Sequence, residues 1–279
     1  PASGEGWAGM AIDGFLTRSV RDTAALIDAT HGPDLGAPYL APAVAWPFLA
    51  EIEKPPRRLK IAYTLKSFTG AALDYECATA VGDAATLLDS LGHDVEEAAP
   101  KIDILDIMRA FCVVVASGVL LSVRARQAAL GRDVGADELE PSTHGALAFA
   151  RTLTGADYLA AVNTVHATGR TMAAFMQDYD VLVTPTLAEP PARLGRIAPR
   201  NPDFLDYRLG PHGIIRYSPF TAVFNASGQP AMSVPLHWTK SGLPVGVHFA
   251  GRFGDDAMLL QLAAELEQAK PWFEKRPVL

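Results

Sequence analysis

A strand-helix-strand pattern between residues 59 and 98 constrains the fold of this chain more than any other feature. The apolar run Leu59–Thr64 has the composition of a short buried strand. Asp74 then caps a helix with one apolar face, and Gly92 ends that helix. The run His93–Ala98 follows as a second strand. Because strands joined by a helical crossover pair in parallel, this unit predicts a parallel sheet.

Helices and strands alternate along the rest of the chain, which indicates an α/β layered architecture. We expect helices at 17–31, 103–130, 143–178 (interrupted near residue 155) and 255–269, a short helix after 217, strands at 180–184, 232–236 and 245–250, and surface connections at 37–58, 131–141 and 185–217. Thr17 and Asp255 are the expected N-caps of the first and last helices. Arg18 and Asp22 stand four residues apart, so they are expected to pair across one helical turn.

The composition is that of an ordinary soluble globular protein, with 49% hydrophobic and 20% charged residues. The formal net charge is -7 and no run of basic residues is present, so nucleic acid and anionic membranes are poor partners. The longest apolar stretch, Phe111–Val123, is interrupted by polar and glycine residues and is shorter than the roughly 20 residues that span a bilayer. We expect it to be a buried helix and expect no membrane association.

Two cysteines, Cys77 and Cys112, lie far apart and form no CxxC pair. Neither a disulfide framework nor a zinc site is therefore expected, and a reducing cytoplasm fits best. The seven histidines show no ligand-like pairing, so we expect no metal. Gly4, Gly6 and Gly9 spell GxGxxG, but no strand precedes them and no helix starts within them. They are expected to form a plain loop, and no cofactor is expected.

Familiar catalytic motifs are missing from the sequence: HExxH, GxxxxGK[ST], GxSxG and SxxK do not occur. Lys66–Ser67 and Lys240–Ser241 are the adjacent lysine-serine pairs. A Ser-Lys arrangement needs a buried neutral amine, because an exposed lysine with a pKa of about 10.4 is a poor base. Both pairs fall in polar turns, so a structural role is favoured. A hydrolase that uses Lys66 and Ser67 is kept as an alternative.

Four segments in order resemble the amidase signature family. They are LTRSVRD with GPD at 16–34, DVLVTPT with PPARLG at 180–195, the pattern F…N..G.PA..VP at 220–235, and GLPVGV at 242–247. The resemblance extends from Gly6 to Trp272. The PPxxLG stretch and the GEGW opening are more similar to simple bacterial amidases, including the aminohexanoate cyclic-dimer hydrolases, than to tRNA amidotransferase subunits.

The resemblance implies a mixed β-sheet flanked by helices, with residues 1–279 forming the C-terminal portion of a single amidase domain. In that family a lysine, a cis-peptide serine and a nucleophilic serine act together, and the serines lie in a Gly/Ser-rich stretch shortly before the LTRSVRD helix. No such stretch occurs here, and Pro1–Gly9 resembles the loop that follows it. The chain opens without an initiator Met or a signal peptide, so it is expected to begin inside a larger protein, with its fold incomplete and with no catalytic residue of its own.

The implied function is hydrolysis of a carbon-nitrogen amide bond in a small molecule, with the triad on a missing N-terminal region and this chain inactive alone. The helical region at about 103–179 is expected to cover the pocket. Phe111, Cys112 and Thr186 are the expected substrate-binding residues, although Cys112 also fits a small core residue. The alternative is a non-catalytic scaffold subunit that binds a separate chain carrying the triad. A homodimer is left open.

Overall fold

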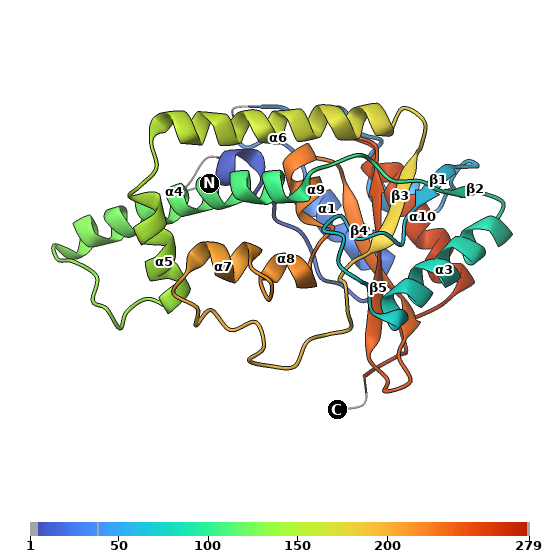
Figure 1. The fold of residues 1–279 in the computed structure, drawn as a ribbon. Coiled ribbons are helices and arrows are strands. Elements are labelled where there is room, and N and C mark those ends of the chain that lie inside the picture. The colour runs from blue at the N-terminus through green and yellow to red at the C-terminus, as the bar shows by residue number, and fades with distance from the viewer. Residues whose placement is uncertain (1–4, 38, 278–279) are drawn as a thin grey trace.

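The computed structural model describes residues 5–37 and 39–277, which form a five-stranded mixed sheet with helices on both faces (Figure 1). The strands are β1 (Lys60–Tyr63), β2 (Asp94–Glu97), β3 (Val181–Pro185), β4 (Ala231–Trp238) and β5 (Pro244–Gly251). Their order in the sheet is β2-β1-β3-β5-β4. β1 pairs in parallel with β2 and β3, whereas β5 runs antiparallel to β3 and β4. The predicted α/β architecture and mixed sheet are confirmed.

The strand-helix-strand unit forms as predicted. Asp74 accepts a hydrogen bond from the backbone N–H of Glu76 at 2.8 Å and so caps α3 (Tyr75–Ser90). Gly92, with φ +94°, takes the left-handed conformation that lets the chain turn back into β2. The result is the expected parallel pairing of β1 and β2.

One face of the sheet is covered by α3, by α1 (Val20–Thr30) and by α10 (Asp256–Ala269), with the single turn α2 (Phe48–Glu51) beside them. Alternate residues of β3 and β5 point toward these helices because side chains alternate along a strand. Val181, Val183, Val247 and Phe249 are completely buried there. Burial of this apolar face is the main stabilising contribution to the layer.

The opposite face is covered by α4 (Ile104–Leu130), α6 (Gly155–Phe175) and α9 (Ala222–Ser227). Ala62, Leu182 and Ala250 face these helices and are completely buried. A third apolar cluster lies farther from the sheet, between α4, α5 (Pro141–Ala150) and α7 (Phe204–Leu209). The short helix α8 (Ile214–Tyr217) leads from α7 toward α9.

Helix α4 is long and apolar enough to cross a membrane by length and composition alone. Core helices of soluble proteins also meet that criterion, and α4 packs against α5, α6, α7 and α9. Eight of its residues are buried in these contacts. In this structure α4 is therefore a packed helix, although within the predicted buried stretch Phe111–Val123 only residues 112 and 114–116 are buried and Leu121 is exposed.

Two predictions at the first helix are wrong. Ser19, not Thr17, is the N-cap, because its hydroxyl accepts from the backbone N–H of Asp22 at 3.1 Å. Arg18 consequently precedes the helix and forms no ion pair with Asp22. Its guanidinium donates instead to the carbonyl of Phe273 and lies over that ring, 5.4 Å from the centroid.

The connections contain more structure than expected. The predicted loop 185–217 includes α7 and α8, and Asp203 caps α7 by accepting from the backbone N–H of Asp206 at 2.9 Å. In the connection 37–58, the carboxylate of Asp28 accepts from the backbone N–H groups of Phe48 and Leu49 and caps α2. These helices are too short to show a periodic pattern, so the sequence did not indicate them.

Candidate functional site

The predicted substrate-binding residues on α4 face different surroundings. Cys112 is 1% exposed and packs with the third cluster, which includes Val115, Ala146 and Phe204. Burial raises the pKa of the Cys112 thiol to about 11, so the thiol stays protonated at neutral pH. This placement is that of a small core residue. Its neighbour Phe111 is only half-buried and lies beside the N-terminal segment.

That segment forms a single tight turn, Trp7–Gly9, which Figure 1 shows next to α4. The indole of Trp7 meets the ring of Phe111 edge to face, with centroids 5.6 Å apart and planes at 73°. Trp7 and Ala8 have φ values of 51° and 53°. For residues with a Cβ this left-handed conformation costs roughly 1–2 kcal/mol each. No residue pattern marks such a turn, so the sequence did not reveal Trp7.

Contacts with Met10 hold this turn in place. The Met10 side chain is fully buried in the core beneath α4 and α6. Its carbonyl accepts a hydrogen bond from Nδ2 of Asn225, on α9, at 3.0 Å. Asn225 belongs to the pattern F…N..G.PA, and that motif was the available signal for it. The turn is thus fixed between α4 and α9.

Helix α9 connects this turn to the sheet. The ring of Phe224 lies 4.9 Å from the ring of His248, on β5, measured between centroids. Burial lowers the pKa of His248 to about 4, so the imidazole is neutral at physiological pH. Nδ1 of His248 is 3.3 Å from the hydroxyl of Thr184, on β3. This buried neutral imidazole packs the core here.

Thr186, the third predicted site residue, immediately follows β3. Its hydroxyl is 2.7 Å from the hydroxyl of Ser233, which is exposed on β4. The two groups meet above Gly246 on the intervening strand β5, where a Cβ atom would lie 2.4 Å from Ser233 Oγ and 2.8 Å from Thr186 Oγ1. Ser233 is paired with His248 across β4 and β5, so both side chains occupy the sheet face that carries α9.

The structure does not bring Phe111 and Thr186 into contact, and the groups that lie between them, Met10 and His248, are buried. A series of neighbours joins them, which we call the wall: Phe111, Trp7 and Met10, then α9 and His248, whose partner across β4 and β5 is Ser233. This wall offers an aromatic surface at one end and two hydroxyl groups at the other. Cys112 faces the helical cluster instead of this wall.

Within the described ranges, 5–37 and 39–277, the wall has no side chain arranged as a general base. None of the lysines there is buried, and no serine hydroxyl is hydrogen-bonded to a lysine or histidine. Lys66 has an 84% exposed side chain, and the hydroxyl of Ser67 is paired with Thr69 at 2.8 Å. In the same part of the chain no three His, Cys, Asp or Glu residues converge as metal ligands do.

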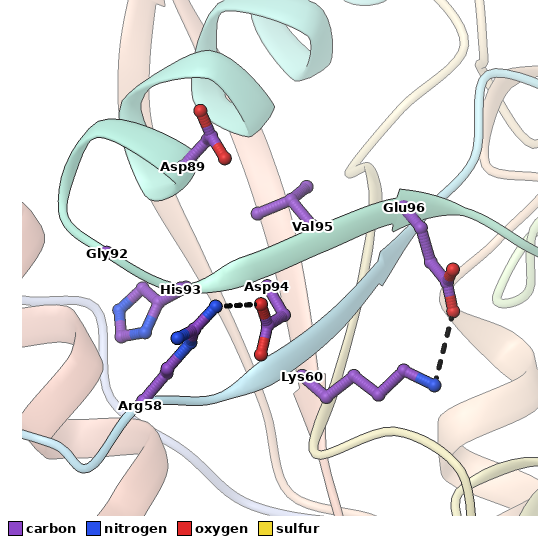
Figure 2. A pocket seen from close by; sticks show the side chains of 8 residues that line it. All are labelled: Arg58, Lys60, Asp89, Gly92, His93, Asp94, Val95 and Glu96. Carbon is purple, nitrogen blue, oxygen red and sulfur yellow. Dashed lines mark hydrogen bonds and ion pairs between the residues drawn. The ribbon is translucent and has the colours of Figure 1, made fainter.

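Two surface concavities lie elsewhere, and neither is lined by Trp7, Phe111 or Thr186. The larger, about 550 Å³, lies at the amino ends of β1 and β2, and Figure 2 shows four of its charged side chains directed at one another in two pairs. Arg58 pairs with Asp94, and Lys60 lies 3.4 Å from Glu96. The smaller, about 480 Å³, lies between residues 71–74 and 188–189, past the carboxyl ends of β1 and β3. Ligands of open α/β sheets bind at the carboxyl ends, which favours the edge that carries Thr186.

Comparison with known proteins shows which family the chain is similar to. Residues 5–260 match the family described as Amidase. The chain is 31% identical over 277 residues to 6-aminohexanoate-cyclic-dimer hydrolase from Pseudomonas sp. (strain NK87), covering 98% of this chain and 56% of that protein. The same figures hold for 6-aminohexanoate-cyclic-dimer hydrolase from Paenarthrobacter ureafaciens.

Solved structures agree with the sequence matches. A 6-aminohexanoate cyclic dimer hydrolase complexed with substrate superposes with a TM-score of 0.88 at 29% identity, covering 97% of this chain and 57% of that one. A bacterial aryl acylamidase of the amidase signature family superposes with a TM-score of 0.77 at 24% identity, covering 94% of this chain and 55% of that one, and supports the fold alone. The chain spans little more than half the length of these relatives.

Proposed function

The chain belongs to the amidase family, and we propose that the complete protein hydrolyses a carbon-nitrogen amide bond in a small molecule. The main support is that nearly the whole chain matches proteins named for amide hydrolysis, in sequence and in fold. The described residues would supply one wall of the substrate pocket, and the helices between residues 103 and 179 would cover it.

We further propose that the reactive groups lie outside these 279 residues. The amidase signature mechanism uses a lysine, a cis-peptide serine and a nucleophilic serine. Every lysine among the described residues is at least partly exposed to solvent, whereas a lysine that acts as a base must be held neutral by burial. The relatives' greater length leaves room for a segment that carries these groups.

In this mechanism the neutral lysine takes a proton from the bridging serine, which in turn takes the proton of the nucleophilic serine. The nucleophile attacks the amide carbonyl, and backbone N–H groups stabilise the oxyanion. The C–N bond breaks and the amine leaves with a proton. Water then attacks the acyl-serine, which releases the carboxylic acid and restores the serine.

Labelling with a fluorophosphonate probe tests this division of roles. The full-length protein should hydrolyse amides and be labelled at one serine outside residues 1–279. The isolated 279-residue chain should be neither active nor labelled. Labelling at any serine within it would refute the proposal, and Ser67→Ala tests the alternative that uses Lys66 and Ser67, since that alternative predicts loss of all activity.

The scaffold alternative has one supporting observation. Among the described residues β4 pairs only with β5, so its other edge is open. Ala231 and Ser233, in the first half of β4, are exposed. An open edge strand of this length normally pairs with another segment or is covered. If that segment belongs to a separate chain, the 279-residue chain should co-purify with it. A stable monomer in size-exclusion chromatography would argue against this alternative.

A further inference from the structure

The turn at Trp7 combines backbone strain with partial exposure of a large aromatic side chain. Trp7 and Ala8 are consecutive left-handed residues, and neither is a glycine. Strained backbone of this kind persists where the surrounding structure determines it, and it is concentrated at ligand-binding sites. The indole nevertheless remains 43% exposed. The strain is therefore not explained by burial of the ring.

Strong contacts on both sides of Trp7 fix its position. Gly9 and Ala11 donate backbone hydrogen bonds to the carbonyl of Gly6 at 3.1 and 3.2 Å, which closes the turn. Beyond it, buried Met10 and its hydrogen bond from Asn225 anchor the chain. The turn is held from within and from α9, so the orientation of the indole is set before any ligand binds.

Helix α4 provides the surface on which the Trp7 indole rests. Phe111 and Gly118 are seven residues apart and lie on the same face of the helix. The indole rests across both: its ring meets Phe111 edge to face, and a Cβ at Gly118 would lie 3.6 Å from Trp7 Cδ1. A methyl group at 118 would make an ordinary contact with the indole, whereas a larger side chain would displace it. One part of the ring is packed on α4, and the rest faces solvent.

We propose, as an extension of the proposed amidase function, that Trp7 and Phe111 form an aromatic platform that binds the apolar chain of the amide's acyl group and selects for its length. A flat, pre-positioned indole offers apolar area with little loss of side-chain freedom on binding. The hydroxyl groups of Thr186 and Ser233, at the other end of the wall, cannot serve an apolar chain in this way. Trp7 thus sets specificity and takes no part in bond breaking.

The test uses the full-length protein and primary amides of straight-chain carboxylic acids of increasing length. For the unsubstituted protein, KM should fall by about two- to fourfold per added methylene over the reach of the platform. Trp7→Ala should abolish this dependence of KM on chain length. Trp46→Phe is the matched control, because Trp46 is an exposed indole stacked on His31, in the connection between α1 and α2.

A second variant and a binding measurement keep the outcome clear if Trp7→Ala is unstable. Gly118→Val should displace the indole and reduce the length dependence, whereas Gly118→Ala, at ordinary contact distance, should not. Straight-chain carboxylates should quench the tryptophan fluorescence of the protein, and Trp7→Phe should lose that quenching. The proposal would be overturned if Trp7→Phe were quenched as strongly as the unsubstituted protein. It would also be overturned if KM depended on chain length in Trp7→Ala as it does in the unsubstituted protein. Absence of amide hydrolysis by the full-length protein would instead refute the proposed function, and the quenching measurement would still decide whether the platform binds apolar chains.

Discussion

The hydroxyl oxygens of Thr186 and Ser233 lie 2.7 Å apart although their strands are not neighbours in the sheet. They meet above Gly246, on the strand between them, because that residue has no side chain to separate them. The glycine of the GLPVGV segment thus has a definite role in the architecture of the wall. It permits a polar contact across three strands, just past the carboxyl end of β3.

Gly246→Ala should destabilise the protein by about 1–3 kcal/mol, because the new methyl group would overlap both hydroxyl oxygens. Urea unfolding of the two proteins measures the difference. Gly251→Ala is the matched control on the same strand, since a Cβ there would meet its nearest neighbours at 3.6 Å. Ser233→Ala should restore part of the stability lost in Gly246→Ala. Equal effects of the two glycine substitutions would contradict the steric explanation.

His248 should make folding sensitive to mild acid. Burial lowers its pKa from 6.5 to about 4, so below pH 6.5 the unfolded chain binds a proton that the folded protein does not. Stability should therefore fall as the pH drops from 6.5 to 4, by up to about 3 kcal/mol from this group alone. His248→Phe removes the titrating group, and its stability should vary less over this range. The comparison requires unfolding curves of both proteins at several pH values, and parallel pH profiles would exclude the effect.

The two cysteines should be inert in the folded protein. Burial raises the pKa of Cys77 to about 12 and that of Cys112 to about 11, and both side chains are 1% exposed. Alkylation by iodoacetamide at pH 8 should be at least about 100-fold slower than in denaturant, because it requires both opening of the fold and the thiolate. Mass spectrometry of timed samples gives the rates. Rapid labelling of Cys112 in the native state would show that it borders an accessible pocket.

Asn225→Ala should loosen the N-terminal turn without unfolding the sheet. Loss of the hydrogen bond to Met10 leaves a carbonyl in the interior unpaired, with an expected cost of about 1 kcal/mol. Hydrogen exchange at the amides of residues 9–11 should accelerate more than exchange in β5. Asn163→Ala, on the exposed surface of α6, is the control and should change neither. Uniform acceleration throughout the chain would mean that Asn225 supports the whole fold and not the turn in particular.

The elements with a strong local pattern were predicted correctly from the sequence. The strand-helix-strand unit around Asp74 and Gly92 has a cap, an amphipathic face and a stop signal, and each acts within a few residues. The family resemblance also needed only the order of short motifs, and the matches over residues 5–260 confirm it. The roles of Phe111, Cys112 and Thr186 in binding remain predictions.

Contacts between distant parts of the chain decided the features that the sequence did not predict. Asp28 caps α2 from 20 residues away, Arg18 binds the carbonyl of Phe273, and Asn225 holds Met10 across 215 residues. The sheet order, the placement of Thr186 beside Ser233 and the exposure of Trp7 depend on packing of the same kind. The sequence by itself determined the strands and the longer helices, because periodicity and caps are local, whereas α2, α7 and α8 are too short to carry such a pattern. Only the tertiary structure decided which side chains meet on the wall, because the energy of such contacts exists only after the layers have packed.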